Sequence, residues 1–469
     1  MAYRDDTDTI VAISTPVGVG GFCIVRLSGP RAIDIADEIF SFKGKNKKSL
    51  KDVPTYTVHY GYIKEDNTII DEALVSVYRA PKSYTREDVV EISAHGGFLP
   101  TRKILELCIR KGARLAAPGE FTKRAFLNGR IDITQAEAVS DIIYAKSEKG
   151  LLLAAAQLAG GLSEEVGSIK NSVLDLMSLI EASLNFPEED DVRPIEPSYI
   201  GSELEKIKSQ VEQFVKLAQQ GKIYREGLYT AIIGKPNVGK STIMNRLLKK
   251  ERVIVTPIPG TTRDIIEDSI TINGVTVVLF DTAGITETVN NEIELIGIER
   301  SKKLLKECDL VIFVIDGSQE LTKEDIEIAK IVKDKNLIVV INKKDLPAKV
   351  NVDDVVKTLF PAGVEDIVVL SALNGDGIDV LENCIFKKAF VEDIAVENCK
   401  FLPNLRHYDI FLRILSHVNA AIEMVKGKVG FEIIAIELRK VLELLAEVTG
   451  ENFTEDILDR IFSQFCIGK

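Results

Sequence analysis

A glycine-rich segment at residues 234–241 reads G-K-P-N-V-G-K-S and directly follows an apolar run at residues 228–233. It matches the G-x-x-x-x-G-K-S pattern of phosphate-binding loops, whose main-chain N–H groups surround phosphate oxygens. Lys240 would add a positive charge, and the hydroxyl of Ser241 would bind Mg²⁺. The segment therefore predicts a site for a nucleoside triphosphate.

Three further motifs follow apolar runs in the same part of the chain: D-T-A-G at residues 281–284, N-K-K-D at residues 342–345 and S-A-L at residues 371–373. The carboxylate of Asp345 can accept two hydrogen bonds from the N1 and N2 donors of guanine, and adenine lacks that pair of donors. The set predicts a site for GTP rather than ATP.

The residue after D-T-A-G is Ile285, at the position where Ras-type proteins carry a water-orienting glutamine. An isoleucine side chain can neither donate nor accept a hydrogen bond. Another group must therefore position the attacking water and neutralise the charge that develops between the β- and γ-phosphates.

Apolar strand-like runs recur at residues 228–233, 275–280, 310–315, 337–341 and 367–370, with helical or loop segments between them. This alternation is typical of a doubly wound, mostly parallel sheet, whose strand ends would hold the four motifs together. Residues 8–120 instead mix strand-like runs, at 11–14, 22–27, 55–63 and 73–79, with a helical stretch at 104–110.

Helical periodicity flanks the predicted sheet on both sides in the sequence. One face is formed by Leu162, Val166, Ile169, Val173, Leu176 and Ile180, another by Leu204, Ile207, Val211, Phe214 and Ala218, and a third by Ile433, Ile436, Val441, Leu444, Leu445 and Val448. An acidic, proline-bearing connector at 186–198 separates the first two. The simplest interpretation is one helical domain interrupted by the α/β domain; two separate bundles are the alternative.

Composition and charge limit the classes of protein to which the chain can belong. The chain has 469 residues, 45% of them hydrophobic, and a formal net charge of −12. It contains neither a recognisable signal peptide nor an apolar run long enough for a bilayer, so a cytoplasmic protein is expected. Dispersed cysteines argue against a zinc or disulfide scaffold. Residues 101–130 nevertheless carry a local charge of +6, which predicts either a tRNA- or phosphate-facing surface or ordinary basic helix faces.

The whole chain resembles the MnmE (TrmE) family of tRNA-modification GTPases. The resemblance rests on the GTPase motifs together with blocks at residues 8–10, 20–21, 26–30, 83–91 and 118–128, and on the C-terminal residues Phe465-Cys466-Ile467-Gly468-Lys469. It implies a multidomain α/β plus α fold. The N-terminal α+β domain (1–120) would be of the tetrahydrofolate-binding type and mediate dimerisation, a discontinuous helical domain would cover 121–220 and 386–469, and a Ras-like P-loop GTPase domain (221–385) would be inserted into it.

The resemblance also implies K⁺-stimulated GTP hydrolysis. Glu294 would orient water indirectly, and Lys240 and Thr262 would complete the catalytic set. Mg²⁺ would be bound by Ser241 and Thr262, and K⁺ by Asn237, Thr256, Ile258 and Thr261. The expected nucleotide-binding residues are Gly234, Asn237, Val238, Gly239, Lys240, Ser241, Thr242, Thr256, Thr261, Thr262, Asp281, Thr282, Ala283, Gly284, Asn342, Lys343, Asp345, Ser371 and Ala372.

A second site is implied in the N-terminal domain, for 5-formyltetrahydrofolate or a related tetrahydrofolate derivative. Its matched residues are Arg26, Glu91, Arg130 and Lys469, and Cys466 has either a chemical role or none. The family works as a homodimer with a MnmG-type flavoprotein, and modifies C5 of the wobble uridine in certain tRNAs. A regulatory GTPase switch, for example in ribosome assembly, is the alternative function.

Overall fold

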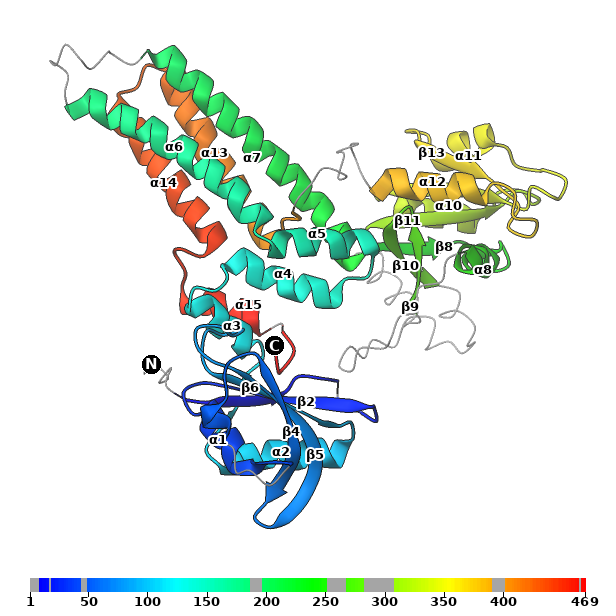
Figure 1. Ribbon diagram of the computed structural model, residues 1–469. Coiled ribbons are helices and arrows are strands. Elements are labelled where there is room, and N and C mark those ends of the chain that lie inside the picture. Colours follow the sequence, from blue (N-terminus) through cyan, green and yellow to red (C-terminus); the bar gives the residue numbers. More distant parts are fainter. Residues whose placement is uncertain are drawn as a thin grey trace. The chain divides into compact units, whose positions relative to one another are not determined.

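The computed structural model describes residues 8–16, 18–43, 49–185, 196–250, 267–281, 308–389, 401–463 and 465–469. The chain forms two compact units (Figure 1). The first comprises residues 1–140, 158–178 and 438–469, and the second comprises residues 141–157 and 179–437. Among the described helices, none combines the length and the apolar character that a membrane span requires.

The first unit contains a seven-stranded sheet with the order β3-β4-β5-β6-β2-β1-β7. Its strands are β1 (Ile10–Ile13), β2 (Phe22–Ser28), β3 (Phe40–Phe42), β4 (Thr57–Glu65), β5 (Thr68–Tyr78), β6 (Val89–His95) and β7 (Arg114–Leu115). Only the short β7 pairs in parallel, with β1. The strand-like runs expected in this region are confirmed within a few residues.

Helices α1 (Ala32–Ile39) and α2 (Phe98–Arg110) cover one face of this sheet (Figure 1). Along β2, Val25 and Leu27 are buried in the core with these helices. Because side chains alternate along a strand, Arg26 between them faces the other side of the sheet. The same alternation on β6 leaves Glu91 on that side, so the two charged residues share a face.

The C-terminal residues pack against the start of the helical region of the first unit. Phe462 and Phe465 join Ala125 and Phe126 in a small apolar cluster. The helices that contribute to this cluster are α3 (Glu120–Leu127), α4 (Ile133–Tyr144) and α15 (Glu455–Phe462). A 3₁₀ turn, η1 (Leu50–Asp52), lies elsewhere in the unit, against the core of the sheet.

The second unit contains a six-stranded sheet with the order β13-β12-β11-β8-β10-β9. All pairs are parallel except β9 with β10. The strands are β8 (Leu228–Ile233), β9 (Glu267–Ile272), β10 (Val275–Asp281), β11 (Leu310–Asp316), β12 (Leu337–Asn342) and β13 (Asp366–Val369). The predicted doubly wound, mostly parallel sheet is confirmed, and its central strand β8 leads into the glycine-rich loop.

Helices cover both faces of this sheet, which explains the unbroken apolar runs. Leu228 and Ile232 of β8 lie in one core, and Ala231 and Ile233 lie in the core of the opposite face. The first core includes α8 (Lys240–Lys250) and α12 (Ile378–Ala389), and the second includes α10 (Lys323–Val332) and α11 (Val352–Leu359).

The other long helices are α5 (Glu148–Leu158), α6 (Gly161–Asn185), α7 (Pro197–Glu226), α13 (Leu405–Lys426) and α14 (Phe431–Thr449). The apolar faces predicted for α6 and α7 are buried as expected. The expectation for α14 was partly wrong, because Ile433 and Ile436 are about half exposed (47% and 49%). The buried face runs through Ile434 and Leu438 instead, in four- and three-residue steps that continue to Val448.

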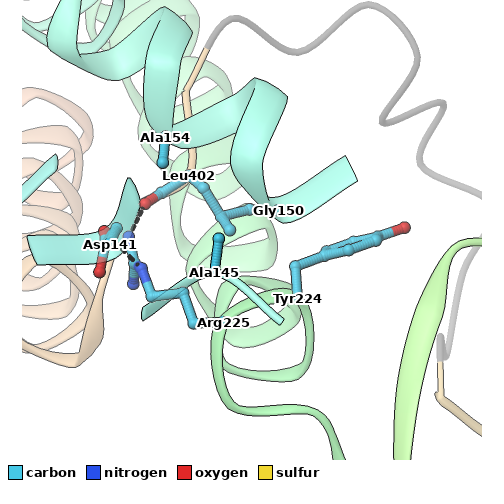
Figure 2. A pocket seen from close by; sticks show the side chains of 7 residues that line it. All are labelled: Asp141, Ala145, Gly150, Ala154, Tyr224, Arg225 and Leu402. Atoms are coloured by element: carbon cyan, nitrogen blue, oxygen red, sulfur yellow. Dashed lines mark hydrogen bonds and ion pairs between the residues drawn. The ribbon is translucent and has the colours of Figure 1, made fainter. Parts of the chain in front are cut away.

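Arg225 joins the segments through which the chain enters and leaves the six-stranded sheet (Figure 2). It lies at the end of α7, just before β8. Its Nε contacts Asp141 Oδ2 at 2.7 Å, and its other nitrogens donate to the main-chain oxygens of Leu402 and Pro403. In addition, the hydroxyl of Thr276 on β10 donates to Lys146 O at 3.0 Å. These contacts bind the residues around the start of the sheet to α4 and to non-helical segments at Lys146 and at residues 402–403 of the same unit.

Candidate functional site

The glycine-rich loop between β8 and α8 contains left-handed backbone conformations and a close packing contact that its residue types allow. Gly239 has φ +102°, and a Cβ there would overlap the side-chain amide of Asn342. Asn237 adopts φ +64°, a left-handed conformation that asparagine tolerates better than most residues. The sequence of the loop thus produces the tight turn that places successive N–H groups at the start of α8.

Lys240 is buried, with 7% exposure, and its ammonium group is held by the loop itself. Nζ donates to the main-chain oxygens of Gly234 at 2.9 Å and Lys235 at 2.8 Å. A lysine side chain loses much rotamer freedom when it is fixed in this way. The loop's own main chain therefore holds the positive charge of Lys240 beside the loop.

Asn342 connects the phosphate-binding loop with the loop after β13. Its Nδ2 donates to Val238 O at 2.8 Å, and its Oδ1 accepts from the N–H of Ala372 at 3.0 Å. The residue is 3% exposed, so both hydrogen bonds are shielded from water. One side chain thus fixes the distance between the loop expected at the phosphates and the loop expected at the base.

Asp345 and Lys343 are held by neighbouring polar groups at the same edge of the sheet. Asp345 accepts a hydrogen bond from the hydroxyl of Ser371. Lys343 Nζ contacts Asp316 Oδ2 at 2.6 Å. Burial opposes ionisation of Asp316, but hydrogen bonds from Lys343 and Ser318 outweigh it and lower the pKa of this carboxyl. An ionised Asp316 keeps Lys343 in place.

The described nucleotide-site residues therefore gather at the carboxyl ends of β8, β12 and β13, beside the point where the strand order reverses. Ser241, the expected Mg²⁺ ligand, is exposed in the first turn of α8, which fits that role. Asn237 is also exposed. The expected residues Thr256, Ile258, Thr261, Thr262, Thr282, Ala283, Gly284 and Glu294, with Ile285 and the side chain of Asp281, lie outside the described residues.

The first unit brings together a second group of expected residues. Arg26 and Glu91 lie directly opposite each other on β2 and β6, with Arg26 Nε 2.8 Å from Glu91 Oε1. Their side chains are 16% and 21% exposed. The Arg26 guanidinium carbon also lies 5.6 Å from the centre of the Phe121 ring. An arginine and a carboxylate at a partly buried surface can both recognise polar groups of a ligand.

The C-terminal residues complete this second group. Gly468 O accepts hydrogen bonds from Arg26 Nη1 at 3.3 Å and from the Ser14 hydroxyl at 3.1 Å, while Lys469 O accepts from Phe121 N at 3.2 Å. Gly468 has φ +96°, and a Cβ there would overlap the main-chain oxygen of Ile13. Burial and the positive charge of Arg26 lower the pKa of Lys469. The C-terminal tail therefore places a second cation, Lys469, near Arg26.

Arg130 reaches the same region through an aromatic ring that no sequence motif indicated. Its guanidinium carbon lies 4.6 Å from the centre of the Tyr84 ring, and that of Arg26 lies 5.9 Å from the same centre. Tyr84 stands in one of the family-like blocks, but nothing in its spacing indicated a contact with both arginines. Cys466, of undecided role, is exposed in the tail.

The +6 charge of residues 101–130 is largely compensated in the folded chain. Six of its eight basic residues form ion pairs, and five of the six pair with acids from outside the segment. The pairs are Arg102–Glu106, Arg110–Glu65, Lys111–Glu38, Arg114–Asp8, Lys123–Asp459 and Arg124–Asp8. Elements distant in sequence supply these counter-charges, which favours the second of the two interpretations, ordinary basic helix faces, over a surface that faces phosphate.

Arg124 is the most buried of these cations, at 8% exposure of its side chain, and it also contacts Glu87 and Glu120. Glu87 in turn accepts from the hydroxyl of Ser28 at 2.6 Å. Ser28 ends β2, two residues after Arg26. This buried network stabilises the strand that carries Arg26. Because Arg124 is already paired with carboxylates, its positive charge is not available to bind phosphate.

Fold and nucleotide site together define a P-loop GTPase with additional α+β and helical parts. Residues 9–130 match the family model "GTP-binding protein TrmE N-terminus", and residues 133–466 match "MnmE helical domain". The tRNA modification GTPase MnmE of Listeria welshimeri is 44% identical over 462 residues, which cover 98% of this chain and 99% of that protein. That of Streptococcus thermophilus is 43% identical over 470 residues and the whole of both chains.

The chain belongs to the MnmE (TrmE) family of tRNA-modification GTPases. Among solved structures, the G domain of the T. maritima FeoB iron transporter is 26% identical and covers 34% of this chain and 98% of its own, with a TM-score of 0.27.

Proposed function

We propose that this enzyme hydrolyses GTP with K⁺ stimulation and works with a MnmG-type flavoprotein on tRNA. The pair would add an aminomethyl or carboxymethylaminomethyl group to C5 of the wobble uridine, position 34, in certain tRNAs. The names of the full-length relatives support a role in tRNA modification. The enzyme would do this work in the cytoplasm.

The observation that carries the proposal is the presence of a second assembled polar site in a GTPase chain. Arg26, Glu91 and Lys469 meet in the first unit although they are far apart in sequence. A regulatory switch would need no such site. We propose that it binds 5-formyltetrahydrofolate or a related derivative, with Glu91 accepting from pterin N–H groups and the cations meeting the glutamyl carboxylates.

In the GTPase reaction, Lys240 would neutralise phosphate charge and Ser241 with Thr262 would hold Mg²⁺. Asn237, with Thr256, Ile258 and Thr261, would hold K⁺, a cation that can do the electrostatic work of an arginine finger. Glu294 would orient the attacking water indirectly. Glu294→Ala is accordingly expected to lower GTP turnover sharply while nucleotide affinity stays nearly intact.

The proposed enzyme is a homodimer joined through its N-terminal domain. Exposed apolar side chains on β4 and β5, on the face opposite α1 and α2, support this: Val58 and Leu74 expose 61% and 47% of their surface. Val58→Glu with Leu74→Glu should convert the dimer to a monomer in sedimentation experiments. Unchanged sedimentation would exclude this face as the interface.

The decisive experiment is a nucleoside profile of tRNA from cells with and without the gene, and from deletion cells that express the Glu91→Gln variant. Loss of the C5 modification at position 34 in both the deletion and the variant is the expected result. Intact modification in the deletion strain would contradict the proposal and favour a regulatory GTPase. Replacement of K⁺ by Na⁺ in a purified GTPase assay should also depress hydrolysis.

A further inference from the structure

The second residue of the phosphate-binding loop, Lys235, is fixed to a helix on the periphery of the same domain. Its Nζ lies 2.7 Å from Asp325 Oδ2 and 3.0 Å from the Thr322 hydroxyl, at the start of α10. The two charged side chains are 11% and 1% exposed. The loop is therefore joined to α10 by an ion pair that is largely shielded from water.

Asp325 depends on this lysine for compensation of its charge. Its Oδ2 also accepts from the N–H and the hydroxyl of Thr322, at 2.8 and 2.9 Å, in the capping box that begins α10. Its Oδ1 is buried and has no hydrogen-bond partner among the described residues. A buried carboxylate in this situation is stable only with its cation in place, so the contact strongly favours one position of Lys235.

The main chain of the same residue holds the phosphate-binding lysine. Lys235 O accepts a hydrogen bond from Lys240 Nζ at 2.8 Å, as Gly234 O does at 2.9 Å. A shift of the Lys235 backbone would move one of these acceptors and release Lys240 from its position. The side chain and the carbonyl of Lys235 thus connect α10 with the ammonium group expected at the β- and γ-phosphates.

We propose that Lys235 is a positioning residue for phosphate binding. Its ion pair with Asp325 anchors the loop to α10, and this anchor holds Lys240 where it meets the phosphates. Lys235 acts through Lys240 and the loop backbone, so its contribution concerns the phosphates of the nucleotide and leaves recognition of the base unchanged. The role belongs to GTP binding and is independent of any action on tRNA or folate.

The test compares a ligand that has phosphates with one that lacks them, in the full-length protein. Lys235→Met should raise the Kd for GDP about tenfold in calorimetric titration. The Kd for guanosine, measured by competition, should change less than about twofold. Lys235→Arg keeps the charge and should restore most of the GDP affinity. Lys388→Met, which removes ion pairs with Glu365 and Asp366 at another part of the domain, is the matched control and should leave both affinities unchanged.

A second variant separates anchoring from the cost of an unpaired carboxylate. In Lys235→Met with Asp325→Leu both charges are gone, so the domain should fold even where the single variant is unstable. A GDP-specific loss that persists in the double variant supports the proposal. Recovery of wild-type GDP affinity in the double variant, or an equal loss of GDP and guanosine in both variants, would overturn it.

Discussion

The nucleotide site and the N-terminal site differ in how their residues are brought together. The described part of the nucleotide site comes from loops at the ends of parallel strands in one sheet, and main-chain atoms hold its key side chains. The N-terminal site joins Arg26 to Lys469, the last residue of the chain, across nearly the whole sequence.

The two sites depend on different kinds of structural support. A strand end and a glycine-rich turn fix the first site locally, so damage to one loop stays in that domain. The second site sets Arg26 against Glu91 on neighbouring strands, and the C-terminal tail supplies a further cation, Lys469, from the far end of the sequence.

Asn342→Ala should have the largest effect, a rise of about 100-fold in the Kd for GTP. The change removes two buried hydrogen bonds, each contributing on the order of 1–3 kcal/mol once a partner is left unsatisfied. Binding of a tetrahydrofolate derivative should not change. Fluorescent-nucleotide titration measures the effect, with Asn374→Ala in the neighbouring exposed loop as the control. Loss of folate binding as well would show that the two sites are not independent.

Gly468→Ala should weaken binding of a tetrahydrofolate derivative by roughly tenfold or more. A Cβ would meet the main chain of Ile13, and the left-handed φ of +96° disfavours alanine. The tail would then leave Arg26 and Ser14, while basal GTP hydrolysis should remain. Isothermal titration and a GTPase assay check both expectations. Ile467→Ser, at an exposed neighbour, is the control, and equal affinities in the two variants would contradict tail docking.

The lowered pKa of Lys469 predicts a pH dependence at the N-terminal site. Burial and Arg26 disfavour its protonated form, so affinity for an anionic ligand should fall several-fold as pH rises, earlier than for an ordinary lysine. The folded chain binds fewer protons than the unfolded chain between the lowered pKa and the usual value. This group's contribution to stability therefore rises with pH in that window.

Titrations from pH 7 to 10 test this dependence, and Lys469→Arg should flatten it because arginine stays charged. An identical pH profile in the two proteins would exclude Lys469 as the titrating group. The GTP site should show no matching change.

Arg102→Ala should have the smallest effect, no more than about 0.5 kcal/mol in the free energy of unfolding and no change at either site. Its pair with Glu106 is a solvent-exposed contact between neighbouring turns of α2. Chemical denaturation measures it, with Arg124→Ala as the contrast: removal of this buried cation should cost roughly 3–5 kcal/mol. Similar losses in both variants would contradict the distinction between exposed and buried pairs.

The sequence alone determined the features that depend on neighbouring residues. Local residue types determine the backbone conformation of two segments, the loop at residues 234–241 and the segment at 342–345. Left-handed turns and strand ends are local properties of the chain. Apolar periodicity also predicted α6, α7 and the mostly parallel sheet. It failed at Ile433 and Ile436, where two overlapping apolar patterns fit the same residues and only packing selects between them.

Only the tertiary structure decided which charges meet. It neutralised most of the basic segment at 101–130 with acids from distant elements, and it placed Arg26 against Glu91, Tyr84 and the C-terminal tail. It also joined Lys235 to Asp325, 90 residues further along the chain. The physical reason is that electrostatic and aromatic contacts depend on distance in space. That distance can be inferred from the sequence only for residues within one turn, strand or helix.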